Sequence, residues 1–341
     1  SGDIYRRGKM ADKLTAKVNT CPKSTAFERF VGFLGASVFS LVYYIAPVYV
    51  LTSPLVLLYN PTAISTWIYL APLIISAVLP CKPNKLVLCS WFARKIPKYF
   101  NYTEILEFDD EELIALTNKR ACILAVCPHG IISYGGICSG LVDGEFNAPL
   151  RQQVLDAFPT AVASVVLSFP IMKHVIGIFG LIDASRKSLS KRLNDGKSFV
   201  LYPGGIAELF LSSPAKEAII ARKGFIRLAL ANGSDVIPIY LFGNTTVLRV
   251  FTHPVLMAVS RSLGASLTLF WGRWGLPLPL PDPLIYVRGK PLGMPKVEGE
   301  PSQALIDEWH VRYVAEVQRL FETYKHLRPD FKEKVLEVSE K

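Results

Sequence analysis

The sequence predicts an α/β domain that is held to a membrane by an N-terminal helical hairpin. Residues 30–81 contain no Asp, Glu, Lys, Arg or His, and an uncharged run of this length is rare in soluble domains. Downstream, short apolar runs alternate with segments of helical periodicity, which is the order of an α/β fold. One run ends at Cys127, Pro128, His129 and Gly130, so a lone histidine follows a buried strand. This combination favours chemistry on a lipid.

The uncharged run is long enough for two membrane passes. A hydrocarbon core about 30 Å thick needs about 20 apolar residues per helix. The expected passes cover residues 31 to about 51 and 64–79, with turns at Ser53-Pro54 and at 59–61. The alternative is a hairpin in the core of a soluble protein. A cleaved signal peptide fits less well, because the run is too long and begins too late.

Basic residues flank both outer ends of the run, and none lies in its central loop. They are Arg6, Arg7, Lys9, Lys13, Lys17, Lys23 and Arg29 before it, and Lys82, Lys85, Arg94, Lys95 and Lys98 after it. The positive-inside bias therefore places both ends in the cytosol. The sequence divides into a basic cytosolic segment (1–29), a membrane hairpin (30–81) and a single larger domain (82–341).

Composition limits the partners. A formal charge of +10 and a pI near 9.2 suit an anionic membrane surface or the phosphates of a coenzyme, or else indicate a generally basic solvated surface. Nucleic acid is not expected, because the basic residues are dispersed and no recognition motif accompanies them. The six cysteines include no C-x-x-C pair and do not cluster with the five histidines, so we expect no metal site and a domain in a reducing compartment.

Local patterns predict the elements of the larger domain. Buried strands are expected at 121–126, 161–167, 198–202 and 236–241, and helices at 109–119, 185–194 and 216–232. Apolar residues at spacings of three and four predict a closing helix; they are Ile306, Trp309, Tyr313, Val317, Leu320 and Tyr324. Residues 247–287 are expected to form an interfacial cover over a site, and 136–140 a glycine-rich turn.

Seven sequence blocks occur in a characteristic order. They are CPHGI at 127–131, FGLIDASR at 179–186, YPGGIAE at 202–208, RKGF at 222–225, VIPIYLFG at 236–243, FWGRWG at 270–275 and VRGKP at 287–291. Together they resemble the type-2 diacylglycerol acyltransferase family, which includes monoacylglycerol and wax-alcohol acyltransferases. The resemblance implies a mixed sheet flanked by helices, as in glycerolipid acyltransferases generally. It also implies that 82–341 is an acyltransferase domain at the endoplasmic reticulum membrane facing the cytosol, in reach of lipid droplets.

The first block carries the expected catalytic residue. His129 matches the second histidine of the family pattern, whereas Cys127 stands where the family has histidine or glutamate. Glycerolipid acyltransferases more widely have aspartate five residues after the histidine, and here that position is Tyr134. The carboxylate partner of the histidine is therefore unassigned. Its candidates are Glu208, Asp183 and Glu145, and Glu208 is favoured because it closes the Pro203-Gly-Gly block.

The resemblance implies that His129 acts as a general base. It would deprotonate the hydroxyl of diacylglycerol during direct attack on the thioester of acyl-CoA, with no cofactor and no acyl-enzyme. A thiol nucleophile at Cys127 is the less favoured route, because an apolar setting leaves a thiol inert. The expected substrate-binding residues are Cys127, Pro128, Gly130, Asp183, Arg186, Pro203, Gly204, Gly205, Arg222 and Lys223, with the glycine amides facing an oxyanion or phosphate and the basic residues facing phosphates of CoA.

Several alternatives stay open. His129 and Glu208 could be structural residues, and Arg186, Arg222 and Lys223 could be solvated charges. The acceptor could be monoacylglycerol or a long-chain alcohol, and a protein that binds lipid or acts as a scaffold without activity is a contrasting interpretation. Acyl-chain preference and the formation of a homo-oligomer are not determined by the sequence.

Overall fold

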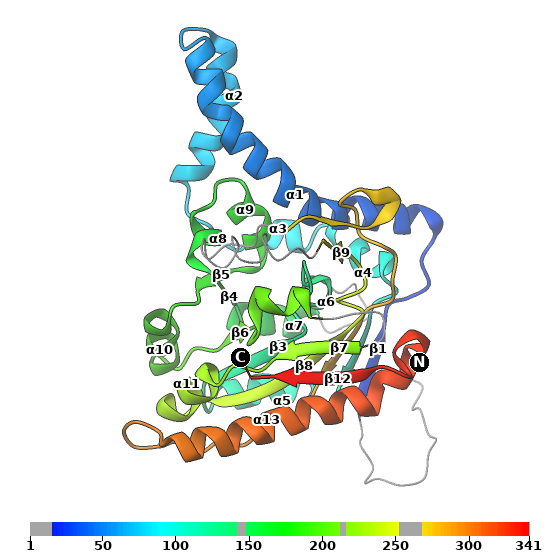
Figure 1. Cartoon of the computed structure of the whole chain (residues 1–341), viewed down its shortest axis with the longest axis vertical. Helices are drawn as coiled ribbons and strands as arrows, with labels where there is room; N and C mark the ends of the chain where they lie inside the picture. The colour runs from blue at the N-terminus through cyan, green and yellow to red at the C-terminus, as the bar shows by residue number, and fades with distance from the viewer. Residues whose placement is uncertain (1–15, 142–147, 212–215, 252–267, 341) are drawn as a thin grey trace.

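The computed structural model describes residues 16–141, 148–211, 216–251 and 268–340, and its centre is an eight-stranded mixed sheet (Figure 1). The strand order is β1-β2-β11-β8-β3-β6-β4-β5. In that order the strands are β1 (Lys17–Thr20), β2 (Thr103–Leu106), β11 (Ile285–Arg288), β8 (Asp235–Phe242), β3 (Cys122–Cys127), β6 (Phe199–Leu201), β4 (Thr160–Val162) and β5 (Leu181–Asp183). Strands β8, β3, β6, β4 and β5 are mutually parallel, whereas β11 runs antiparallel to β8. The predicted α/β class is confirmed.

Helices cover both faces of the sheet, because its central strands are apolar on both sides. All six residues of β3 are buried, and they alternate between two cores. Ile123 and Ala125 pack on the side of α11 (Gly224–Asn232) and α13 (Gln303–Tyr324). Leu124 and Val126 pack on the side of the remaining helices. Those helices are α3 (Lys85–Leu88), α4 (Ile96–Tyr99), α5 (Asp110–Thr117), α6 (Tyr134–Ser139), α7 (Ala148–Ala157), α8 (Ser164–Ser168) and α9 (Met172–Ile176). By contrast, α10 (Arg186–Asn194) places Leu189 and Leu193 in the core on the side of α11 and α13.

Two apolar helices project from this domain as a hairpin, α1 (Ala26–Tyr59) and α2 (Ile64–Val78) (Figure 1). Only α1, among the described helices, is long and apolar enough to cross a membrane. The 15 residues of α2 extend about 22 Å. The arms are joined by Tyr49 and Tyr69, whose rings lie 4.8 Å apart, and by Thr52, whose hydroxyl lies 2.7 Å from the hydroxyl of Tyr69.

The expected turn at Ser53-Pro54 is wrong, because α1 continues through Pro54 to Tyr59. Hydroxyl groups in this turn of helix bond to carbonyls one turn back: Thr52 Oγ1 to Val48 O at 2.8 Å and Ser53 Oγ to Tyr49 O at 2.6 Å. Serine and threonine hydroxyls help an apolar helix to tolerate an internal proline in this way. The chain reverses at 60–63, which overlaps the second predicted turn at 59–61.

The first half of α1 does not project but packs on the domain against η1 (Ala93–Lys95) and α4. Gly32 permits this approach, since a Cβ there would lie 2.1 Å from Lys95 O. Farther along α1, the hydroxyl of Tyr134 donates to Ala36 O at 2.9 Å, and Tyr44 bonds to both main-chain groups of Phe270. The hairpin is thus rigidly continuous with the domain.

Three local predictions were wrong. Strand β4 stops at Val162 and is followed by α8, because a short apolar run does not by itself distinguish strand from helix. The helix expected from residue 216 starts at Gly224, because residues before it form β7 (Lys216–Ile220), which pairs with the distant β12 (Val335–Ser339). The expected turn at 136–140 belongs to α6, where the glycines serve close packing.

The closing helix is confirmed as α13, and its predicted stripe is buried over the sheet. Of the expected interfacial cover, residues 252–267 lie outside the described residues. Its described part contains β9 (Arg249–Val250), β10 (Phe270–Trp271) and η4 (Arg273–Gly275). The prediction is wrong for its last residues, 285–287, which belong to β11 of the central sheet. The other short helices are η2 (Gly177–Phe179), η3 (Gly205–Phe210), η5 (Lys325–Leu327) and η6 (Pro329–Phe331).

Candidate functional site

The candidate site lies where three neighbouring parallel strands end. His129 follows β3, the Gly204-Gly205 turn and Glu208 follow β6, and Asn244 follows β8. Parallel strands deliver the residues at their carboxyl ends to one edge of a sheet, where α/β proteins generally bind ligands. The sequence predicted His129, Gly204, Gly205 and Glu208 as one site, and the sheet order β8-β3-β6 brings them together.

The tautomer of His129 is set by its own turn. Nδ1 lies 2.6 Å from Gly130 O, and because a carbonyl can only accept, a proton on Nδ1 makes this hydrogen bond. Nε2 of the neutral ring then carries the lone pair. Burial lowers the pKa of His129 below its ordinary value of 6.5, so the ring is neutral at pH 7. The ring stands edge-on to Tyr202, with centroids 4.7 Å apart.

Glu208 holds the main chain of this histidine. Its carboxylate accepts the His129 N–H at 2.7 Å and the Ile220 N–H at 3.0 Å, and the residue is 2% exposed. Burial raises the pKa of Glu208 to about 7, while the two N–H groups oppose that rise. Gly204 leaves room for the carboxylate, since a Cβ there would lie 2.2 Å from Oε1. Glu208 therefore contacts the backbone of His129, whereas the partner of Nδ1 is a carbonyl.

Asn244 holds the same loop from the opposite side. Its Nδ2 donates to Pro128 O at 3.1 Å and to His129 O at 2.6 Å, and its Oδ1 accepts the Gly135 N–H at 3.0 Å. Gly130 has a φ of 63°, and a Cβ on it would lie 2.4 Å from Asn244 O. Both polar atoms of the amide, Nδ2 and Oδ1, are thus used to position the histidine loop. Only glycine fits at position 130 without displacing Asn244.

Comparison with known proteins identifies the family. Residues 58–339 match the family model described as diacylglycerol acyltransferase.

The chain belongs to the diacylglycerol acyltransferase family.

Curated relatives agree with this assignment. The chain is 30% identical over 234 residues to 2-acylglycerol O-acyltransferase 3 of Homo sapiens, an alignment that covers 62% of this chain and 66% of the relative. It is 31% identical over 227 residues to diacylglycerol O-acyltransferase 2 of Dictyostelium discoideum, covering 61% and 67%. It is also 30% identical to the human diacylglycerol O-acyltransferase 2, covering 62% and 58%. The alignments thus span roughly three fifths to two thirds of these relatives' lengths.

Among solved structures, the chain is similar to the 1-acyl-sn-glycerophosphate acyltransferase of Thermotoga maritima. The TM-score is 0.41 at 14% sequence identity, over 83% of this chain and 94% of that one.

In this family member, Tyr134 stands five residues after His129 in place of the expected aspartate, and it has a structural role. Tyr134 is fully buried at the start of α6, and its hydroxyl reaches α1 as described above. Next to it, Ser133 Oγ accepts the hydroxyl of Tyr202 at 2.7 Å, and Gly136 makes room for that contact, because a Cβ there would lie 2.5 Å from the Tyr202 hydroxyl. This segment connects the histidine site to the anchor helix.

Cys127 lies beneath the site rather than in it. Its side chain belongs to the core on the α11 and α13 side, with Sγ 3.6 Å from Ile239 O. Burial raises the pKa of the Cys127 thiol well above its ordinary value, which keeps it protonated. Pro128 enters the site through its carbonyl, which Asn244 binds.

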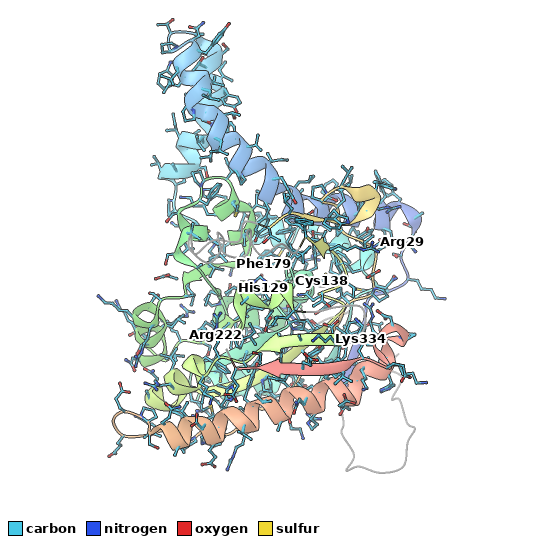
Figure 2. All side chains as sticks on the ribbon, viewed as in Figure 1. Arg29, His129, Cys138, Phe179, Arg222 and Lys334 are labelled. Atoms are coloured by element: carbon cyan, nitrogen blue, oxygen red, sulfur yellow. The ribbon has the colours of Figure 1, made fainter. Side chains whose placement is uncertain are left out.

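The predicted phosphate contacts are dispersed. Arg222 is exposed, and it follows by two residues Ile220, whose N–H donates to Glu208, so it lies beside the site; Figure 2 labels both Arg222 and His129 in the body of the domain. Lys223 forms ion pairs at 3.0 Å with Asp307 and Glu340. Arg186 pairs with Glu300 at 3.5 Å on the exposed face of α10, which has an open depression of about 620 Å³.

The remaining carboxylate candidates are not brought to His129. Asp183 ends β5 at the sheet edge, where it accepts hydrogen bonds from Ser164 and Ser185. Glu145 lies outside the described residues. Pro203 leads into the glycine turn, whose Gly205 N–H donates to Tyr202 O at 3.1 Å.

Sequence reasoning missed Asn244, Tyr202 and the Gly130 carbonyl as parts of the site. Asn244 directly follows the VIPIYLFG block. That place after a buried parallel strand was the signal that would have identified it.

Proposed function

We propose that this chain is an acyl-CoA-dependent O-acyltransferase that makes triacylglycerol from diacylglycerol, with His129 as the general base. The observation that carries the proposal is the geometry of His129, whose Nδ1 faces Gly130 O and whose Nε2 is left as the proton acceptor. Family membership supports the reaction class, and the activities for which the relatives are named support the lipid acceptor. The endoplasmic reticulum membrane, with the domain in the cytosol, is the proposed location.

The proposed step is direct transfer. Nε2 of His129 takes the proton of the acceptor hydroxyl while its oxygen attacks the thioester carbonyl carbon. The tetrahedral intermediate collapses, the carbon–sulfur bond breaks, and the proton passes from the imidazolium to the CoA thiolate. The main-chain contacts of Glu208 and Asn244 hold the histidine in place for this sequence. Because the Cys127 thiol is buried and protonated, an acyl-cysteine is not part of the proposal.

The negative charge that develops on the oxyanion must be stabilised by hydrogen-bond donors. The Gly205 amide is already used in its turn, so the proposed donors are the amides of Gly130 and Gly204. Arg222, which is exposed beside the site, is the favoured contact for a CoA phosphate, and Arg186 with the depression on α10 is a more distant one.

The test is product analysis with purified full-length chain, labelled acyl-CoA and a panel of acceptors. We expect triacylglycerol from diacylglycerol, and His129→Ala should lower turnover by roughly 10²- to 10⁴-fold, the usual contribution of a positioned base. His326→Ala, at an exposed histidine in η5, is the matched control and should retain activity. Substantial turnover by His129→Ala would refute the assignment of the base.

Monoacylglycerol is the second candidate acceptor, because one relative, at 30% sequence identity to this chain, is a 2-acylglycerol O-acyltransferase. A long-chain alcohol is the third. The acceptor panel separates them, since each gives a different neutral lipid. Absence of any product, together with retained lipid binding, would instead favour the inactive scaffold.

A further inference from the structure

Large apolar side chains are exposed on the domain at the foot of the hairpin. On α1 these are Phe27 (64% exposed), Phe30 (55%) and Leu34 (49%), beside it Trp91 (47%) and Phe92 (67%), and on η4 Trp274 (69%). We call these six residues the aromatic face. Soluble proteins rarely leave such a contiguous group in water, so a patch of this kind marks a binding surface.

The aromatic face is built on an amphipathic stretch of helix. Phe27, Phe30 and Leu34 repeat at spacings of three and four, whereas Phe33 and Ala36 on the other side of α1 are buried against the domain. Ring contacts join the parts: Phe27 lies 6.2 Å from Trp91, Trp91 lies 5.1 Å from Phe92, and Phe33 lies 6.0 Å from Trp274. Phe27, Trp91 and Phe92 thus form one cluster, and Trp274 packs against the same helix through Phe33.

Cations accompany the exposed rings. The guanidinium of Arg273 lies 4.5 Å from the ring of Trp274. Arg29 is exposed on the same end of α1, at the margin of the domain in Figure 2. Tryptophan with adjacent Lys or Arg is typical of the boundary between lipid chains and headgroups, where the ring is half immersed and the cation meets phosphate.

We propose that the aromatic face rests in the headgroup region of the bilayer and is a second membrane contact of the catalytic domain. The occupant is lipid because α1 runs without a break from this face into the projecting hairpin, so a membrane that holds the hairpin meets the face at its foot (Figure 1). The inference rests on the membrane anchoring proposed above. It adds that the first half of α1 lies along the membrane surface and fixes the orientation of the domain.

The test uses single-tryptophan versions of the full chain in vesicles of phosphatidylcholine and phosphatidylserine whose acyl chains are brominated near the headgroup. The chain has five tryptophans; the four others are changed to Phe when a native one is retained, and all five are changed when one is introduced elsewhere. We expect Trp91 and Trp274 to be quenched several-fold more strongly than a tryptophan introduced by Val311→Trp, which is 64% exposed on α13 at the opposite side of the domain. Trp67, at the start of α2, reports hairpin insertion.

The proposal is overturned if Trp67 is quenched while Trp91 and Trp274 behave like the residue at 311, because the hairpin would then be inserted without the domain face. If Trp67 also escapes quenching, anchoring itself fails and the proposal falls with it. Neither result depends on enzymatic activity. Should a single-tryptophan version not fold, removal of one tryptophan at a time from the native chain measures the same contributions.

Discussion

His129 is positioned through its main chain, and this defines the chemistry available at the scale of single residues. Glu208 accepts its N–H, Asn244 donates to its carbonyl, and Gly130 O receives its ring proton. Only Nε2 of the neutral ring remains as a proton acceptor. A carboxylate on the ring is therefore unnecessary for selecting the tautomer, which explains how Tyr134 can replace the usual aspartate and serve α1 instead.

Asn244→Ala should reduce kcat by about 10²-fold, because loss of the three amide hydrogen bonds releases the histidine loop, and a shift near 1 Å has that effect. Steady-state kinetics on the full chain measures it. Asn232→Ala is the control, since that amide bonds to Leu228 O of its own helix and to Ser190 Oγ of α10 and makes no contact with the histidine loop, and it should leave kcat unchanged. Equal activity of both variants would contradict the positioning role of Asn244.

Glu208 should make stability depend on pH. Its pKa is about 7 in the folded chain and 4.5 otherwise, so the folded state holds a proton that the unfolded state releases between these values. Stability therefore falls as pH rises from 4.5 to 7, by at most about 3 kcal/mol. Thermal unfolding of native chain and Glu208→Gln across this range checks it: the difference between them should shrink toward pH 7. Parallel curves would contradict the buried carboxyl.

At the scale of elements, the decisive contact is between α1 and the domain. Alanine normally improves a helix interior over glycine by about 1 kcal/mol. Gly32→Ala should do the opposite, because its Cβ would lie 2.1 Å from the main-chain oxygen of Lys95 and separate α1 from η1. We expect a loss of about 1–3 kcal/mol, the usual effect of overpacking.

Thermal unfolding in detergent measures the effect of Gly32→Ala. Gly224→Ala, at the first position of α11 where a Cβ meets nothing within 4 Å, is the matched control and should be neutral or stabilising. If both variants had the same stability, α1 would not depend on this close approach.

At the scale of the whole molecule, the prediction concerns the side of the membrane that the domain faces, and the structure shows which glycosylation sequons can report it. Three sequons occur, at Asn101, Asn232 and Asn244, but Asn244 is buried and would be silent on either side of the membrane. Asn101 is exposed and is the informative acceptor. With both termini cytosolic, glycosidase treatment of protein expressed in a eukaryotic host should cause no mass shift. A glycan at Asn101 would place the domain in the lumen.

The sequence by itself determined the parts that depend on local pattern. Residues 30–81 lack charge, and this predicts the hairpin. The apolar runs predict β3, β6 and β8, because strands buried on both faces must be apolar throughout. His129 and Glu208 were found through the order of blocks. Their placement at adjacent strand ends agrees with that reading.

Only the tertiary structure decided how these parts act on one another. Strand β7 depends on pairing with β12, more than a hundred residues away, which no local periodicity encodes. The same holds for Asn244, whose amide reaches His129 because β8 lies beside β3, and for Glu208, whose contact is with a backbone N–H rather than the imidazole. Hydrogen-bond partners are set by strand order and register, and these follow from the packing of the whole chain.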